Sequence, residues 1–182
     1  MKTRRRILGI ALILTCMLGA NSKAQEIRAL DDSPLDLAVF RPDGRGTVPA
    51  ARIIYSRPLK KGRTMLGEKV PYGKVWRLGA NQSTEINLYR DMTFGGKKLK
   101  AGNYTVYAIP NKEAWTILFN SNLYTWGAFE YDQSKNVLEV SVPVRKSSQS
   151  RESFGMAFDG KDGKGNLLMA WEDIEVVIPL TY

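Results

Sequence analysis

The strongest constraint on the fold is the rhythm of short apolar runs and turn residues along the chain. Between residues 52 and 180, runs rich in Val, Ile, Tyr, Phe and Trp alternate with clusters of Gly, Pro, Asn and Asp. No amphipathic helical run of about 12 residues interrupts them. Short strands separated by turns are typical of antiparallel sandwiches and barrels. The sequence therefore predicts an all-β fold, a single antiparallel β-sandwich with a jelly-roll-like or barrel-like variant as the alternative.

Individual strands are predicted where the pattern is clearest. Residues 85–89 alternate polar and apolar side chains, as a half-buried strand does, and residues 104–109 run on to Pro110. Further strands are predicted at 52–55, 115–119, 137–144, 153–158, 167–171 and 174–180. Residues 59–84 and 120–136 have the weakest pattern and are predicted to be long loops. Long ordered loops often carry function, so candidate sites are sought there.

The first residues have the three-part layout of a secretory signal peptide. Lys2 and three arginines precede an uncharged apolar stretch at residues 7–20, and Ser22-Lys23-Ala24 offers small residues for a cut after Ala24. A membrane anchor is the alternative, but the stretch is shorter than the roughly 17–25 residues that a spanning helix needs. We expect residues 1–24 to be a signal peptide, residues 25–182 to be a single β-sandwich domain, and the protein to be periplasmic or secreted.

A lipoprotein is a further alternative, because Cys16 lies in this segment. Cys16 sits inside the apolar run rather than after it, and Thr15 is a poor match to the small residue that precedes a lipidated cysteine. Lipidation is therefore disfavoured. After cleavage we expect no stable membrane span.

Composition excludes several classes of chemistry. The chain has no histidine, which removes catalytic triads, His-ligated zinc and His general bases. Its one cysteine would leave with the signal peptide, and thiol chemistry and thiolate metal sites would leave with it. We expect no cofactor and no metal site.

The net charge is partly a property of the export segment. Loss of residues 1–24 removes five basic residues and lowers the formal charge from +9 to +4. The remaining basic residues are interleaved with acidic ones rather than gathered in a stripe. We therefore do not expect a nucleic-acid partner.

Four motifs lie in the predicted loop and the strand before it: YSRP at 55–58, KGR at 61–63, PYG at 71–73 and WRLGAN at 76–81, followed by Thr84. This pattern resembles the bacterial domain-of-unknown-function family numbered 2911, whose members look like exported, all-β Bacteroidetes-type proteins with no established activity. The resemblance covers about residues 33–179. It implies export and an all-β fold but no reaction. Where the family often has Glu after Asn81, this chain has Gln82, so a shared catalytic acid at that position would be missing here.

The motif segment contains the first set of candidate binding residues. A guanidinium fork donates two parallel hydrogen bonds to a planar anion, so a pocket of Arg and Asn side chains suits a carboxylate, a phosphate or sugar hydroxyls. The structural alternative is that these side chains satisfy the buried carbonyls of a long loop. The candidates are Arg57, Arg63, Trp76, Arg77, Asn81 and Thr84.

The second set of candidates is aromatic. Tyr124 and Trp126, with Phe129 and Tyr131, crowd a short stretch around Gly127. Exposed aromatic rings stack on the apolar faces of sugars or anchor a protein partner. The alternative is a loop that folds back and plugs one end of the sandwich with its own side chains.

Carboxylates give no clear signal of catalysis. The glycine-rich stretch at 159–166 lacks the spacing of a calcium loop and reads as a hairpin turn. Acids that could pair for glycoside hydrolysis are present, but nothing in the sequence pairs them. We therefore name no catalytic residue and consider an enzyme the less favoured reading.

Three functions remain after these exclusions. The leading one is non-catalytic binding of a glycan, a small anionic molecule or an envelope partner. The second is a carboxylate-based hydrolase that acts on envelope or dietary glycans. The third is a purely structural envelope protein, in which the arginines are consumed by internal hydrogen bonds and the aromatic rings are buried. The sequence leaves the oligomeric state open.

Overall fold

The structure is a computed structural model, which describes residue 27 and residues 29–182. All the strands lie in one compact unit, Asp31–Tyr182, which contains its own hydrophobic core. The predicted signal peptide and the cut after Ala24 fall outside the described residues. Among the described residues, no helix has both the length and the apolar character that a membrane crossing requires.

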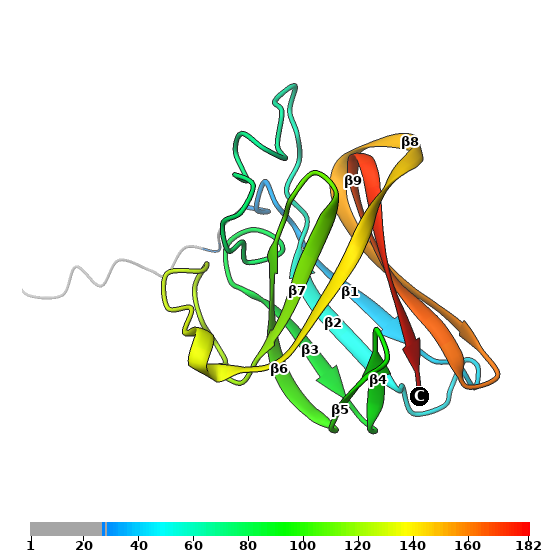
Figure 1. The fold of residues 1–182 in the computed structure, drawn as a ribbon. Helices are drawn as coiled ribbons and strands as arrows, with labels where there is room; N and C mark the ends of the chain where they lie inside the picture. Colours follow the sequence, from blue (N-terminus) through cyan, green and yellow to red (C-terminus); the bar gives the residue numbers. More distant parts are fainter. Residues whose placement is uncertain (1–26, 28) are drawn as a thin grey trace, which may run out of the picture. The chain divides into compact units, whose positions relative to one another are not determined.

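Nine antiparallel strands form a single open sheet (Figure 1). The only helical element in the described part of the chain is a short 3-10 turn, η1 (Gln133–Lys135). Along the sheet the strands follow the order β1-β2-β3-β6-β7-β8-β9-β4-β5. The predicted all-β, antiparallel class is thereby confirmed. The strands are β1 (Leu35–Phe40), β2 (Ala51–Ser56), β3 (Thr84–Leu88), β4 (Met92–Phe94), β5 (Lys97–Leu99), β6 (Gly102–Ile109), β7 (Ala114–Asn120), β8 (Asn136–Lys161) and β9 (Lys164–Thr181).

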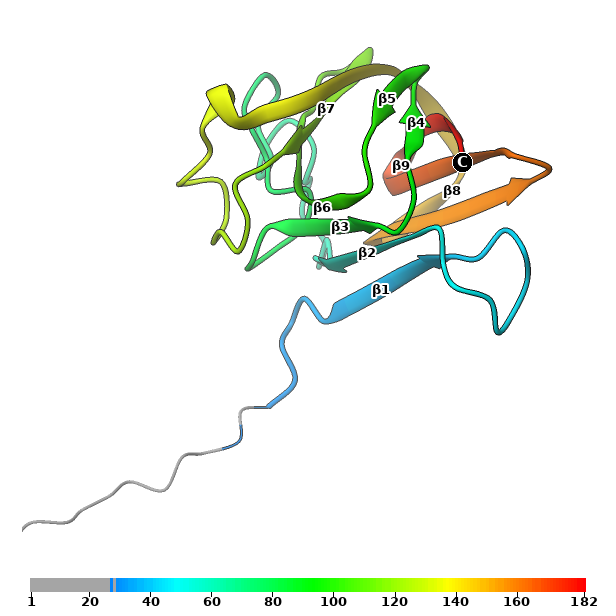
Figure 2. The same ribbon diagram turned by 90° about the horizontal axis from the view of Figure 1, so that it is seen from below.

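The sheet curls over its own core, so that the outer part of β8 returns beside β1 and β2 (Figure 2). The long strands β8 and β9 make this possible. The start of β8 pairs with β7, and the rest pairs with β9. The ladder between β8 and β9 shifts register between Lys146 and Gly155, and Glu172 on β9 adopts a positive φ of 51°. Such irregularities bend a strand, and the outer arm of the hairpin returns to β1, where Phe40 stacks on Phe158.

Buried aromatic side chains dominate one end of the core. Trp76 stacks on Trp171 with ring centroids 5.7 Å apart, and its edge meets Trp115 at 5.8 Å and Phe154 at 5.1 Å. Trp76 comes from the long loop, whereas the other three come from strands β7, β8 and β9. The loop is therefore fixed to the core at this point. Its backbone there bonds to β6, with the Trp76 amide donating to the Ala108 carbonyl at 2.7 Å.

The observed strands differ from the expected ones in three places. Strand β1 has no predicted counterpart. Its apolar residues Leu35 and Leu37 face outward and its charged residue Asp36 faces inward, which is the reverse of the usual pattern. Strands β4 and β5 flank the predicted turn at Gly95-Gly96 and are three residues long each. Strand β8 includes the predicted strands 137–144 and 153–158 and the polar stretch between them. Strand β9 likewise includes the predicted strands 167–171 and 174–180.

Candidate functional site

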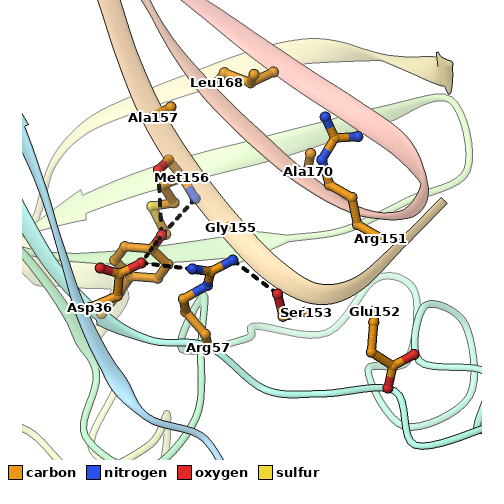
Figure 3. Close-up of a pocket in the computed structure, with 11 residues that line it drawn as sticks. Asp36, Arg57, Arg151, Glu152, Ser153, Gly155, Met156, Ala157, Leu168 and Ala170 are labelled. Carbon is orange, nitrogen blue, oxygen red and sulfur yellow. Dashed lines mark hydrogen bonds and ion pairs between the residues drawn. The ribbon is translucent and has the colours of Figure 1, made fainter. Parts of the chain in front are cut away.

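The YSRP motif forms a clasp between the two sides of the sheet. Arg57 follows β2, and its Nε donates to the Phe154 carbonyl of β8 at 3.0 Å. Its Nη2 donates to Ser153 Oγ at 2.9 Å, and its Nη1 pairs with the Asp36 carboxylate of β1 at 3.1 Å. Figure 3 shows the guanidinium between Asp36 and Ser153, with Gly155 alongside. All three nitrogens of Arg57 are thus engaged within the protein.

Tyr55 completes the clasp from the neighbouring position of β2. Its hydroxyl accepts from the Met156 amide at 2.8 Å and donates to Asp36 Oδ2 at 3.1 Å. The side chain is only 2% exposed. Burial raises the pKa of the Tyr55 hydroxyl above its ordinary value of 10.0. A neutral phenol therefore holds the backbone of β8 against β2.

A pocket of about 380 Å³ opens beside this clasp (Figure 3). Its lining includes three of the smallest residues, Gly155, Ala157 and Ala170. In Figure 3 the Glu152 side chain points away from Arg57, and Arg151 donates from Nη1 to Ser147 Oγ at 2.6 Å. Two charged residues of the lining, Arg57 and Asp36, already form an ion pair with each other. We interpret this pocket as the space beside a structural clasp.

The KGR motif also serves the loop itself. Arg63 donates from Nε to the Lys60 carbonyl and from Nη2 to the Leu59 carbonyl, both at 2.8 Å. Arg63 lines a second pocket of about 480 Å³, together with Glu152 and Glu172. It does not meet Arg57 or Arg77 in one pocket, because those two residues line other cavities.

The carboxylates of this second pocket hold the loop against the hairpin. Glu172 accepts from two successive amides, those of Met65 at 2.9 Å and Leu66 at 3.0 Å. Glu152 accepts from the Lys61 amide at 2.6 Å. Carboxylates that accept from backbone amides in this way anchor chain segments. Asp173 also lines the pocket, and no group of three or more metal-ligating acids occurs among the described residues.

Within the WRLGAN motif, Trp76 and Thr84 have structural partners. Trp76 is 8% exposed, and its indole Nε1 donates to the Gly79 carbonyl at 3.0 Å. Thr84 is fully buried at the start of β3, and its hydroxyl donates to the Leu78 carbonyl at 2.8 Å. These bonds close the tight turn that the motif makes.

The turn is paired with the aromatic loop. The Ser83 amide donates to the Thr125 carbonyl and the Gly127 amide to the Asn81 carbonyl, both at 3.1 Å. Gln82 and Trp126 form an isolated antiparallel bridge between these bonds. Asn81 also reaches Asp31, whose carboxyl pKa is lowered by hydrogen bonds from the Ser33 amide and the Asn81 side chain. The structure thus brings Asn81 and Trp126, predicted from two separate loops, to one place.

Arg77 has the opposite environment to Arg57. Its Nε is the one buried side-chain polar atom without a hydrogen-bond partner in the described part of the chain. Nη1 lies 2.9 Å from the position that a Cβ on Gly127 would occupy, and the Phe129 ring lies 3.0 Å from the same position. The guanidinium and the ring therefore lie side by side over Gly127. Burial lowers the pKa of the Arg77 guanidinium below its ordinary value, but the group stays charged at neutral pH.

The cavity around Arg77 is basic and partly apolar. It has a volume of about 340 Å³ and is lined by Arg77, Lys69, Lys74 and Phe129, among others. No acidic residue belongs to the lining, and neither lysine forms a salt bridge within the described residues. Val70, Pro71, Val75, Trp76 and Ala128 supply the apolar part. We call this cavity the Arg77 pocket.

Three residues on the segments beside Arg77 have strained backbone conformations. Leu78, Asn81 and Tyr124 have positive φ angles of 54°, 60° and 62°. Left-handed conformations cost energy for residues other than glycine and cluster at sites where function requires them. Leu78 is also fully buried, at 1% exposure. The chain therefore keeps costly backbone geometry on both segments that meet beside Arg77.

Some residues of this site escaped the sequence analysis. Lys69 and Lys74 flank the PYG motif and carry no local sign of their convergence on Arg77. Asp36, Ser153 and Glu172 have roles that depend on partners far away in the sequence. Phe129 belongs to the predicted aromatic cluster, and its place beside Arg77 follows from the contact at Gly127.

Comparison with known proteins supplies the family and nothing more specific. No curated protein and no solved structure matches the chain. A family profile described as a protein of unknown function, DUF2911, matches residues 45–180, which include the clasp residues Tyr55 and Arg57, the Arg77 pocket and both long loops. The chain therefore belongs to the DUF2911 family.

Proposed function

We propose that the protein is a non-catalytic binding protein for a small anionic ligand, which it holds in the Arg77 pocket. The observation that carries this proposal is the buried, unpartnered Nε of Arg77. A buried donor without a partner costs about 1–3 kcal/mol. Unpaired groups of this kind call for a specific explanation, such as a water, an ion or a ligand. An anion on the terminal nitrogens of this guanidinium would offset the cost of burying its charge.

The charges around Arg77 favour the same ligand. Lys69, Lys74 and Arg77 repel one another across a cavity whose lining holds no carboxylate. An anion that enters the pocket relieves this repulsion and meets donors that are already positioned. Because Nε is shut off from solvent, the ligand would be bound through the terminal nitrogens and the two ammonium groups.

The apolar part of the pocket defines the rest of the ligand. Phe129 presents a ring beside Arg77, and Val75 and Pro71 add apolar surface. An acidic sugar, which has a carboxylate and an apolar ring face, satisfies both halves of the site. Inorganic phosphate or a simple carboxylate would satisfy the basic half alone. The proposal includes export to the periplasm or beyond, where such glycan fragments are available.

The two rival functions draw on other parts of the molecule. A hydrolase would use the carboxylates of the second pocket, but Glu152 and Glu172 are already engaged with backbone amides of the loop. A purely structural role fits Arg57 and Arg63, whose donors are consumed internally. It does not explain the buried, unpartnered Nε of Arg77 or the exposed aromatic rings.

The test is thermal unfolding in the presence of glucuronate, inorganic phosphate and neutral glucose. A ligand that binds only the folded state adds about 2.7 kcal/mol of stability at a hundredfold excess over its Kd. We expect dose-dependent stabilisation by glucuronate and phosphate and none by glucose. Arg77→Met should keep the fold and lose the stabilisation, whereas Arg63→Met should keep it. A flat response to both anions, or a response that survives in Arg77→Met, would contradict the proposal.

A further inference from the structure

Three aromatic side chains protrude from the loop beside the Arg77 pocket. Tyr124 is 82% exposed, Phe129 84% and Trp126 51%. The other tryptophans, Trp76, Trp115 and Trp171, are all buried. We call Tyr124, Trp126 and Phe129 the aromatic rim. The loop therefore does not plug the sandwich with these rings, and apolar area remains in water that a soluble monomer would normally cover.

Hydrogen bonds of Thr125 hold the base of the aromatic rim in place. Thr125 is 3% exposed, and its hydroxyl bonds to Ser83 Oγ at 2.9 Å and to the Tyr107 hydroxyl at 2.8 Å. Thr125 therefore points into the protein between Tyr124 and Trp126, which remain exposed. Gly127 and Phe129 connect the rim to Arg77. The rings are thus presented on a fixed support next to the basic pocket.

We propose that the aromatic rim and the Arg77 pocket together dock the protein on a membrane surface that contains anionic phospholipids. This inference rests on the proposed function, because the headgroup phosphate would be the anion in the Arg77 pocket. Lys69 and Lys74 lie beside it as further cations. Trp126, Tyr124 and Phe129 enter the headgroup region, where aromatic side chains are enriched at membrane surfaces.

Charge complementarity and ring exposure favour a membrane surface as the occupant of the aromatic rim, because Phe129 and Tyr124 are more than four-fifths exposed and two lysines line the adjoining pocket. Each Lys or Arg near an anionic surface contributes about 1 kcal/mol. Stable association of a peripheral protein generally takes two signals, such as an apolar anchor together with basic residues. This surface has both.

Two acids adjoin the surface in sequence, Glu68 and Glu130. Both are exposed, and neither lines the Arg77 pocket. The three basic residues of the pocket therefore outnumber the acids next to them. The attraction to an anionic bilayer is net favourable and should weaken with salt.

The experiment uses the protein without residues 1–24, which keeps the compact unit Asp31–Tyr182 and removes the apolar stretch 7–20. Binding is measured by co-sedimentation with vesicles of phosphatidylcholine alone and of phosphatidylcholine mixed with phosphatidylglycerol. Tryptophan emission is recorded in parallel. Because the other three tryptophans are buried, a blue shift on binding reports the entry of Trp126 into the interface.

We expect binding to the mixed vesicles only, together with a blue shift. Lys69→Ala with Lys74→Ala should weaken binding about 25-fold, from about fivefold per charge. Phe129→Ser should weaken it about tenfold or more through lost apolar burial. The matched controls are Lys161→Ala, in the exposed turn end of the β8–β9 hairpin, and Tyr89→Ser, an exposed ring beyond the far end of β3. Both controls should bind like the parent protein.

The result also separates this inference from the proposed function. If phosphate stabilises the protein through Arg77 but the mixed vesicles do not bind, the docking inference is overturned and the anion pocket stands. Equal binding to both vesicle types, or binding unchanged by the lysine and Phe129 substitutions, also overturns it. If neither phosphate nor vesicles bind, both proposals fall.

Discussion

Arg57 and Arg77 lie in the same family motif segment and have opposite surroundings. Arg57 uses all three nitrogens, on a carbonyl, a hydroxyl and a carboxylate, and so joins β1, β2 and β8. Within the described residues, the Nε of Arg77 is buried without a partner, and the two lysines of its pocket form no salt bridge. The same side chain is thus a structural clasp in one region and an open binding group in the other. The difference lies entirely in the partners that the fold supplies.

The two motifs are alike in sequence, but their arginines have different roles. YSRP and WRLGAN both place an arginine after an aromatic residue. In the first, Tyr55 and Arg57 point to the same strand and act together. In the second, Trp76 enters the core while Arg77 faces a cavity. Mutations at these positions should therefore separate stability from binding.

The largest effect is expected at the clasp. Arg57→Met removes hydrogen bonds to Phe154 and Ser153, which should lower the free energy of unfolding by about 2–3 kcal/mol. The ion pair with Asp36 adds little, because both side chains are 39% exposed and solvent screens them. Urea unfolding measures the change. Arg63→Met serves as the control and should cost below about 1 kcal/mol. A clasp variant as stable as the parent would refute the structural interpretation of Arg57.

A smaller effect with a distinctive pH dependence is expected for Tyr55→Phe. The substitution leaves the buried Met156 amide without its acceptor, at a cost of about 1–2 kcal/mol. Because the pKa of Tyr55 is raised above 10.0 in the folded state, the fold favours the neutral phenol. This stabilisation is fully present below pH 10.0 and is lost as the pH rises through the raised pKa.

The measurement is urea unfolding of both proteins at pH values on either side of 10.0. The stability advantage of the parent over Tyr55→Phe should be constant below that pH and shrink above it. Tyr89→Phe, at an exposed ring, provides the control and should match the parent near neutral pH. An advantage that grows with alkaline pH would show that the assignment of Tyr55 is wrong.

The smallest effect on stability is expected at Arg77. Arg77→Met keeps the packing of the side-chain stem and removes the unsatisfied Nε, so stability should stay the same or rise by up to about 1 kcal/mol. The same variant should lose the stabilisation by glucuronate and phosphate. Unfolding curves with and without the anions measure both quantities. A loss of stability above about 1 kcal/mol would mean that Arg77 has a structural partner, like Arg57.

The fold class could be predicted because β3 alternates polar and apolar residues and β6 is a short run rich in aromatic and β-branched residues. The bend in β8 could not, because the stretch 145–152 is polar and its pairing depends on β9. The roles of the two arginines were equally hidden. Arg57 meets Phe154, which is 97 positions away, and the isolation of Arg77 is a property of the assembled pocket. Sequence reasoning found the segment that carries the site but could not sort its arginines.

The exposure of the rings in the aromatic loop could not be predicted from the sequence either. The sequence placed Tyr124, Trp126 and Phe129 close together but left open whether the rings were buried or exposed. Exposure is decided by Thr125 and Gly127, whose contacts with Ser83, Asn81 and Arg77 orient the loop. Thr125 and Ser83 are 42 positions apart, and the other two contacts span still more of the chain, so no local pattern encodes them.

An open sheet has two free edges, and unprotected edges invite other chains to add strands and aggregate. Strand β5 is three residues long and exposes Lys97 and Lys98, which discourages an incoming strand. Strand β1 is longer and exposes Leu35 and Leu37.

On β1, even-numbered residues bond to the β2 side, as the Pro34 and Phe40 carbonyls do, so the amide of Leu37 faces the free edge. Asp36 Oδ1 accepts from that amide at 2.8 Å, while Oδ2 holds Arg57 and Tyr55. One carboxylate therefore serves solubility as well as stability, because it occupies the backbone donor that an added strand would need.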